Sequence, residues 1–181
     1  MGPLMSDAYR EMNLQLHESN PDYGATGQTN GSAIAALAKR MGCSTILDFG
    51  CGKGTLKPAI AQADPSLAVS EYDPAVPGKD TLPSAQFDAV VALDVMEHIE
   101  PEYLDSVLDT IRRLSRKCVV LVVATRPATK NLPDGRNAHL IVEQPKWWQG
   151  RLRGYFQPME ETIQEEGLVF IGLPKPPAPG T

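Results

Sequence analysis

The chain has 181 residues, of which 42% are hydrophobic and 22% charged, so we expect one compact domain with a sizeable buried core. Its net charge of −5 excludes a protein that is basic throughout, and no apolar run is long enough to cross a bilayer. The three cysteines, Cys43, Cys51 and Cys118, form no C-x-x-C pair, which argues against a disulfide framework and favours a cytoplasmic location.

Helical and strand-like segments alternate along the chain. The spacing of apolar residues predicts helices at 7–18, 32–40, 56–63 and 101–114, with a shorter one at 159–166. Apolar runs of strand length occur at 45–47, 68–72, 87–93, 118–124 and 168–173. Strands and helices in this order predict an α/β fold with a doubly wound, mostly parallel, Rossmann-like sheet.

The first strand leads into a turn that contains three closely spaced glycines. Gly50, Gly52 and Gly54 follow Asp48 in the pattern D-x-G-x-G-x-G. Because glycine has no Cβ, such a turn lets the backbone bend sharply and approach a ligand closely. The dinucleotide fingerprint G-x-G-x-x-G needs its third glycine at position 55, where this chain has Thr55. The spacing therefore disfavours a dehydrogenase.

The second strand ends at Asp73, about 20 residues beyond the glycine turn. In nucleoside-binding α/β folds, a carboxylate at this place accepts hydrogen bonds from ribose hydroxyls. Glu71 alternates with Asp73 along the strand, and Asp73 suits the role better because it stands at the strand end. The stretch that follows, 74–86, contains three prolines and a glycine, so we expect a shortened region here in place of a helix and a further strand.

The glycine pattern resembles the first motif of class I S-adenosylmethionine (SAM)-dependent methyltransferases. The sequence D-V-M-E-H-I at 94–99 is common in the same superfamily, and the stretch 132–139 with Trp147 and Trp148 is similar to small bacterial and phage-borne members. The resemblance covers about residues 20–172. It implies SAM as the cofactor and methyl transfer to an oxygen or nitrogen atom of a small or phosphate-bearing acceptor. The cofactor residues that it implies are Asp48, Gly50, Cys51, Gly52, Gly54, Asp73, Asp94 and Val95.

The resemblance also suggests a division of the chain. We expect residues 1–30 to form a helix and loop that cover the site, 31–173 to form the SAM-binding domain, and 174–181 to form a flexible Pro-rich tail. The long polar segment from Thr125 to Trp148 is expected to be a mobile cover on the acceptor side. The candidates for the acceptor pocket, apart from His98 and His139, are Tyr9, His17, Tyr23, Arg136 and Trp147.

Three interpretations of the histidines stay open. His98 or His139 is a candidate catalytic residue that takes a proton from the acceptor, because the pKa of histidine lies near neutrality. Alternatively, Asp94, Glu97 and His98 lie at i, i+3 and i+4 and, with His139, resemble the E-x-x-E-H…H metal site of small-RNA 2′-O-methyltransferases and some ubiquinone-pathway O-methyltransferases. Asp in place of the first Glu weakens that match, so a divalent metal is not favoured. In the third interpretation these side chains only line the pocket.

Two alternative functions also remain. The segment 126–153 carries six basic and two acidic residues, hence +4 in a chain of −5, which suits an RNA or nucleotide methyltransferase. A SAM-binding protein without catalytic activity is the other alternative. A small-molecule acceptor is the favoured partner.

Overall fold

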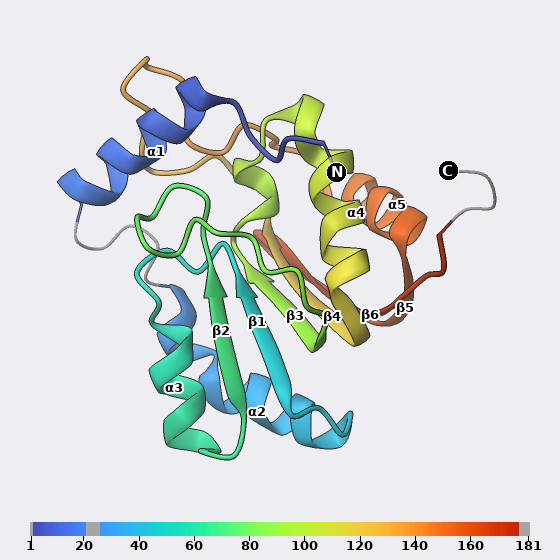
Figure 1. The fold of residues 1–181 in the computed structure, drawn as a ribbon. Coiled ribbons are helices and arrows are strands. Elements are labelled where there is room, and N and C mark those ends of the chain that lie inside the picture. Colours follow the sequence, from blue (N-terminus) through green and yellow to red (C-terminus); the bar gives the residue numbers. More distant parts are fainter. Residues whose placement is uncertain (1, 21–25, 178–181) are drawn as a thin grey trace.

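A computed structural model describes residues 2–20 and 26–177 (Figure 1). The helices are α1 (Asp7–Ser19), α2 (Gly31–Arg40), α3 (Leu56–Ala63), α4 (Leu104–Leu114) and α5 (Pro145–Tyr155), with short 3-10 turns at Thr26–Thr29, Met96–His98 and Pro101–Tyr103. The strands are β1 (Thr45–Phe49), β2 (Ala68–Tyr72), β3 (Phe87–Leu93), β4 (Ser115–Ala124), β5 (Phe156–Gln164) and β6 (Gly167–Pro174). None of the described helices has the length and apolar character needed to span a bilayer.

The strands form one six-stranded sheet in the order β2-β1-β3-β4-β6-β5. The first four of these strands run parallel, whereas β6 is antiparallel to both β4 and β5. Helices α2 and α3 cover one face of the sheet and α4 and α5 cover the other (Figure 1). The doubly wound, mostly parallel α/β sheet expected from the sequence is confirmed.

Burial on both faces explains why the central strand β3 is apolar at all positions except Asp88. Along β3, Val90 and Ala92 pack against the α4 and α5 side, while Ala89 and Val91 pack against the α2 and α3 side. All seven residues of β3 are buried. A strand covered by helices on both faces favours apolar side chains along its middle, and the one polar residue of β3, Asp88, lies near its start.

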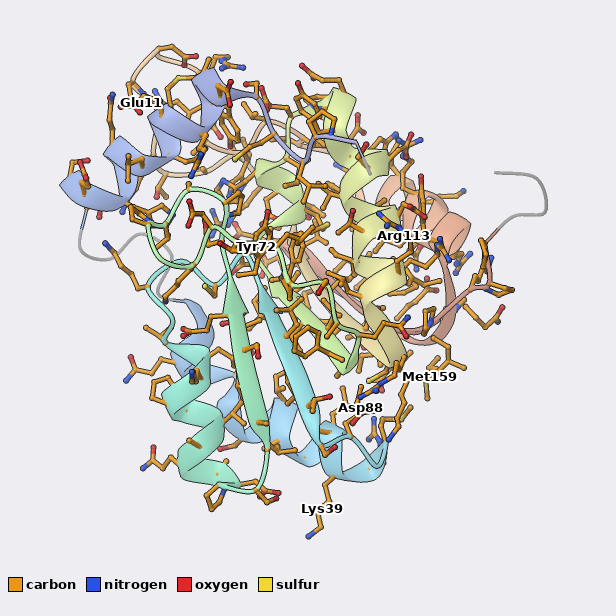
Figure 2. All side chains as sticks on the ribbon, in the orientation of Figure 1. Glu11, Lys39, Tyr72, Asp88, Arg113 and Met159 are labelled. Atoms are coloured by element: carbon orange, nitrogen blue, oxygen red, sulfur yellow. The ribbon has the colours of Figure 1, made fainter. Side chains whose placement is uncertain are left out.

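The end of the sheet opposite the glycine turn is closed by charges around Asp88, which Figure 2 labels at the start of β3. Its carboxylate accepts hydrogen bonds from Ser44 and the backbone of Thr45, and it pairs with Arg116 at 3.2 Å and with Lys117. The backbone hydrogen bond from Ser44 and its neighbours hold the pKa of Asp88 well below its usual range. The Asp88 carboxylate therefore links the beginnings of strands β1, β3 and β4.

The prediction of a helix at 159–166 was wrong, because this stretch belongs to strand β5. Its backbone pairs antiparallel with β6 from Phe156↔Pro174 to Gln164↔Gly167, and a two-residue turn joins the strands. Met, Glu and Gln favour a helix locally, but the cross-strand hydrogen bonds decide the structure. The pairing also places Pro174 inside β6, so the boundary expected for the tail lies within a strand; residues 178–181 lie outside the described part.

The shortened region after the second strand is confirmed. Between β2 and β3 the chain makes only turns and bends. Arg10 of α1 donates a hydrogen bond to the carbonyl of Pro74 at 2.7 Å and pairs with Asp80 at 2.6 Å. The N-terminal helix is thereby attached to the loop that replaces the expected helix and strand.

Helix α1 lies across one end of the sheet beside the segment of residues 125–140 (Figure 1). A small apolar cluster joins the two: Tyr9 and Leu16 of α1 pack with Leu132 and Ala138. Segments distant in the sequence thus form a common roof over the carboxyl ends of the parallel strands.

Candidate active site

A cavity of about 300 Å³ lies under this roof. Its floor is formed by the residues after β1, β2 and β3, and its walls by α1 and the segment after β4. The chain continues from β1 to β2 on one side and then to β3 on the other, so the cavity lies at the point where the strand order reverses. Open α/β sheets bind their ligands at this position.

The glycine turn forms part of the floor. Gly50, Gly52 and Gly54 have φ angles of 75°, 49° and 74°, which residues with a Cβ adopt only at a cost. A Cβ at Gly50 would lie 2.6 Å from a methyl carbon of Val95, so the turn also needs the absence of a side chain for space. Gly50, Cys51 and Gly52 line the cavity.

Two carboxylates flank this turn. Asp48, at the end of β1, is 4% exposed, and burial, followed by the charge of Glu71, raises its pKa to about 7. Asp73 accepts hydrogen bonds from the backbone N–H groups of Gly52 and Ala75 at 2.9 and 3.0 Å. Both acids line the cavity, so each is placed to meet a ligand.

The residues after β3 form the next part of the wall. Asp94 has a φ of 54°, a left-handed conformation that is uncommon outside glycine, and its backbone N–H donates to the carbonyl of Val122. Asp94, Val95 and His98 all face the cavity. Strain of this kind is often found at functional sites.

His98 and His139 meet although 41 positions separate them in the sequence. Their ring centroids are 4.7 Å apart and their planes stand at 89°. The Nδ1 atom of His98 lies 2.8 Å from the carbonyl oxygen of Ala138, and Nδ1 of His139 lies 2.6 Å from that of Arg126. A carbonyl only accepts, so both Nδ1 atoms carry the proton and the Nε2 atoms carry the lone pairs. Burial lowers both pKa values, that of His98 to about 4, so both rings are neutral near pH 7.

Glu97 lies directly behind this pair and is fully buried. Its Oε1 accepts a hydrogen bond from the backbone N–H of Ala124 at 2.9 Å, whereas its buried Oε2 has no hydrogen-bond partner. Burial raises the pKa of Glu97 to about 8. The carboxyl group is thus held in an environment that penalises its charge unless a cation accompanies it.

Comparison with known proteins assigns the family. The sequence profile described as "Methyltransferase domain" matches residues 21–163, well over half of the chain. The chain belongs to this methyltransferase family. Comparison with curated proteins by sequence gives no significant match.

Solved structures share the fold of the methyltransferase. The DhpI–SAH complex has a TM-score of 0.67 at 18% identity, with 96% of this chain and 100% of that chain covered. The Burkholderia thailandensis 1,6-didemethyltoxoflavin-N1-methyltransferase, solved with its substrate and S-adenosylhomocysteine, has a TM-score of 0.67 at 16% identity, covering 97% and 93%. The N-terminal domain of EvdMO1 with SAH has a TM-score of 0.54 at 16% identity, covering 97% and 100%.

Helix α1 supplies the wall of the methyltransferase cavity that faces the glycine turn. The Tyr9 hydroxyl donates to the carbonyl of His98 at 2.5 Å, and burial raises its pKa to about 12, so it remains a donor. At the start of the helix, the Ser6 backbone N–H and hydroxyl both donate to the carboxylate of Glu100 at 2.7 Å. His17, together with Tyr9, lines the cavity as expected.

Asn137 organises the segment after β4, a role that the sequence analysis missed. Its side chain accepts a hydrogen bond from the backbone N–H of Ala128 and donates one to the carbonyl of the same residue, both at 2.9 Å. The same oxygen accepts from the backbone N–H of His139 at 3.0 Å. Asn137 therefore sets the position of His139. An Asn beside a proline-glycine turn was the available signal.

Some predicted site residues of the methyltransferase lie away from the cavity. Gly54 faces Glu71 and Lys79 instead. Arg136 pairs with Asp134 at 2.7 Å, and Trp147 is 37% exposed at the surface, so neither lines the cavity. Tyr23 lies outside the described residues.

The structure also adds cavity residues that the sequence analysis did not select. Asn13 of α1 and Pro74 and Ala75 after β2 line the cavity beside the predicted residues. From the basic segment, Arg126 and Lys130 reach it. Two basic side chains therefore line the cavity, and Arg126 is paired with Glu166 at 2.6 Å.

Proposed function

We propose that the protein is a SAM-dependent methyltransferase that binds the cofactor in this cavity. The observation that carries the proposal is the glycine turn between two cavity-lining carboxylates, in a chain that belongs to a methyltransferase family. Gly50 and Gly52 would hold the methionine part of the cofactor, Asp48 its ammonium group and Asp73 its ribose hydroxyls. Solved structures with the same fold, such as DhpI and EvdMO1, hold S-adenosylhomocysteine, which supports this placement.

The acceptor is a small molecule that presents a hydroxyl or amine to His98 and His139. The roof formed by α1 and residues 125–140 suits a small ligand better than a polymer, and Lys130 in the cavity lining suits an anionic or phosphate group on it. The 1,6-didemethyltoxoflavin-N1-methyltransferase, which has the same fold, was solved with 1,6-didemethyltoxoflavin bound, and a small molecule of this kind agrees with the proposed class.

Methyl transfer needs little chemistry from the protein. When bound, SAM would supply a methyl group from its sulfonium to the acceptor oxygen or nitrogen, with the acceptor's proton passing to solvent and S-adenosylhomocysteine left as the second product. The protein contributes by holding both reactants in line and excluding water. The neutral imidazoles of His98 and His139 accept a hydrogen bond from the acceptor and orient its reacting atom.

The alternative of an RNA or nucleotide acceptor has less support. Four of the six basic residues at 126–153 pair with carboxylates: Arg126 with Glu166, Arg136 with Asp134, Arg151 with Asp105 and Arg153 with Glu161. These pairs reduce the field available to a phosphate backbone. A steep salt dependence of substrate binding would favour a nucleic acid, and weak salt dependence a small molecule.

Calorimetry with SAM, S-adenosylhomocysteine and NAD tests the cofactor assignment. Binding of the first two and not of NAD is expected. Turnover is then measured as S-adenosylhomocysteine release with a panel of small phenols, amines and phosphorylated hydroxy compounds. Cofactor binding without turnover on any of them would favour the non-catalytic alternative, and binding of NAD alone would refute the assignment.

A further inference from the structure

We propose that Glu97, His98 and His139 form a binding site for one divalent transition-metal ion on the acceptor side of the cavity. One candidate ligand atom from each residue lies within 4.8 Å of the other two. This is the only such group of three found in the described part of the chain. The site goes beyond the methyl transfer proposed above and depends on it only for the chemical use of the ion.

The two histidines are oriented as metal ligands are. In metal sites, a ligating histidine donates its second ring N–H to a carbonyl or carboxylate, which fixes the tautomer and the ring direction. His98 and His139 both do so through Nδ1, to the carbonyls of Ala138 and Arg126. The carbonyl acceptors leave Nε2 as the ligating nitrogen of each ring.

Glu97 supplies the third ligand and an independent reason to expect a cation. Its Oε1 is held by the backbone N–H of Ala124, which fixes the carboxylate, but Oε2 is buried without a hydrogen-bond partner. An unpaired buried oxygen of this kind is costly, and a cation between it and the imidazoles removes that cost. Both histidines line the cavity, so an ion has a route to the site.

The ligand chemistry selects the metal. Two imidazoles and one carboxylate suit Zn²⁺, Fe²⁺, Co²⁺ or Mn²⁺, whereas Mg²⁺ prefers oxygen ligands. Three protein ligands leave coordination positions open toward the cavity, as catalytic metal sites require. Asp94, which the sequence pattern offered as a fourth ligand, does not belong to the group.

A cation at this site would help the acceptor to lose its proton. An acceptor hydroxyl that joins the ion loses its proton to solvent more readily, because the positive charge stabilises the oxyanion. The histidines then act on the acceptor through the ion instead of accepting a hydrogen bond from it. Loss of activity in a histidine variant does not separate these two roles, so the test must measure the metal itself.

Co²⁺ and Zn²⁺ titrations of the untagged, metal-stripped chain provide this test, followed by visible absorption for Co²⁺ and by calorimetry for both ions. We expect one ion per chain, with Mg²⁺ unable to compete at equal concentration. Glu97→Gln and His139→Gln should each weaken binding at least about 100-fold, the upper end of the loss seen when an outer partner of a metal ligand is removed. His17→Gln, which removes the one remaining histidine of the chain, should leave the affinity unchanged.

Circular dichroism of every variant first confirms that it is folded. Absence of Co²⁺ and Zn²⁺ binding, or equal binding by the wild type and all three variants, would overturn the site and leave Glu97 as a protonated carboxylic acid. S-adenosylhomocysteine binding is measured on the same samples. Cofactor binding without metal binding rejects the metal site alone, whereas metal binding without cofactor binding rejects the proposed function alone.

Discussion

The carboxylate of Asp73 accepts a hydrogen bond from the backbone N–H of Gly52 at 2.9 Å, so the end of β2 is tied directly to the glycine turn that follows β1. The second carboxylate oxygen holds the N–H of Ala75. A residue expected to bind the ribose therefore also fixes the shape of the turn expected to bind the methionine part.

This link predicts that Gly52→Val and Asp73→Ala both weaken SAM binding. Valine at a φ of 49° strains the turn and places a side chain at the cavity floor, and alanine releases two backbone N–H groups. Calorimetry should show a loss of at least tenfold, about 1.4 kcal/mol. Gly42→Ala is the matched control, because Gly42 has a φ of 61° but open space around it. It should cost about 1 kcal/mol of stability and leave SAM affinity unchanged.

The raised pKa of Asp48 predicts that SAM binding depends on pH near neutrality. Its pKa of about 7, raised by burial and by Glu71 and Asp73 and opposed by Lys79, means that the carboxyl group is partly protonated at pH 7. Only the ionised form pairs with the ammonium of SAM, so affinity should fall as the pH decreases from 8 to 6. Asp48→Asn should bind weakly and lose this dependence. Wild-type affinity that is constant over this range would contradict the role.

The same shift has a consequence for stability without ligand. Because the folded pKa of Asp48 exceeds the ordinary value of 3.8, the folded state binds the proton more tightly. This residue's contribution to the free energy of unfolding should therefore decline as the pH rises from about 4 to about 7. Asp48→Asn should remove that decline in urea unfolding measured across the same range.

Asn137→Ala should loosen the segment that carries His139. The variant loses two hydrogen bonds to Ala128 and one to the His139 backbone. Deuterium exchange of residues 125–139 should become faster, and S-adenosylhomocysteine should no longer slow it as in the wild type. Helix α5 is the internal control, because it packs into the core. Exchange of 125–139 that is equal in variant and wild type would show that Asn137 does not hold the segment.

Replacement of the two adjacent tryptophans should have very different effects on stability. Trp148 is fully buried, whereas Trp147 is 37% exposed and stacks with Arg151 at 5.7 Å. Trp148→Ala should lower the free energy of unfolding by about 3–5 kcal/mol, as large core deletions do. Trp147→Ala should change it by less than about 1 kcal/mol and leave turnover intact. Chemical denaturation of both variants checks this.

The sequence predicted the parallel part of the fold because a strand that is buried on both faces appears in the sequence as a continuous apolar run. Strand Phe87–Leu93 is apolar at every position except Asp88, and Gly50, Gly52 and Gly54 all have the positive φ angles that glycine adopts readily. Such runs are missing at the edge of the sheet formed by β5. Residues 159–166 resemble a helix but form part of a strand, and no helix was predicted at 145–155, which contain Gly150 and Gly154 yet form α5 around buried Trp148.

The predicted site residues that belong to one motif mostly line the cavity. Residues from the glycine turn, Asp73 and the stretch after β3 all reach the cavity, because the ends of parallel strands converge. Arg136 and Trp147 were misplaced because loop side chains have no periodicity to follow. The contact of His98 with His139 and the buried Glu97 oxygen depend on how the 125–139 segment folds back, which no local pattern encodes.

Helix α1 is fastened at two separate places: Ser6 and Tyr9 hold the stretch after β3, and Arg10 holds the loop after β2. Those two places border the acceptor end and the ribose end of the cavity. A single rigid element therefore governs the entrance to both. We therefore expect product release and cofactor exchange both to require movement of α1, so that the rate at which α1 detaches would set a common upper limit for the two.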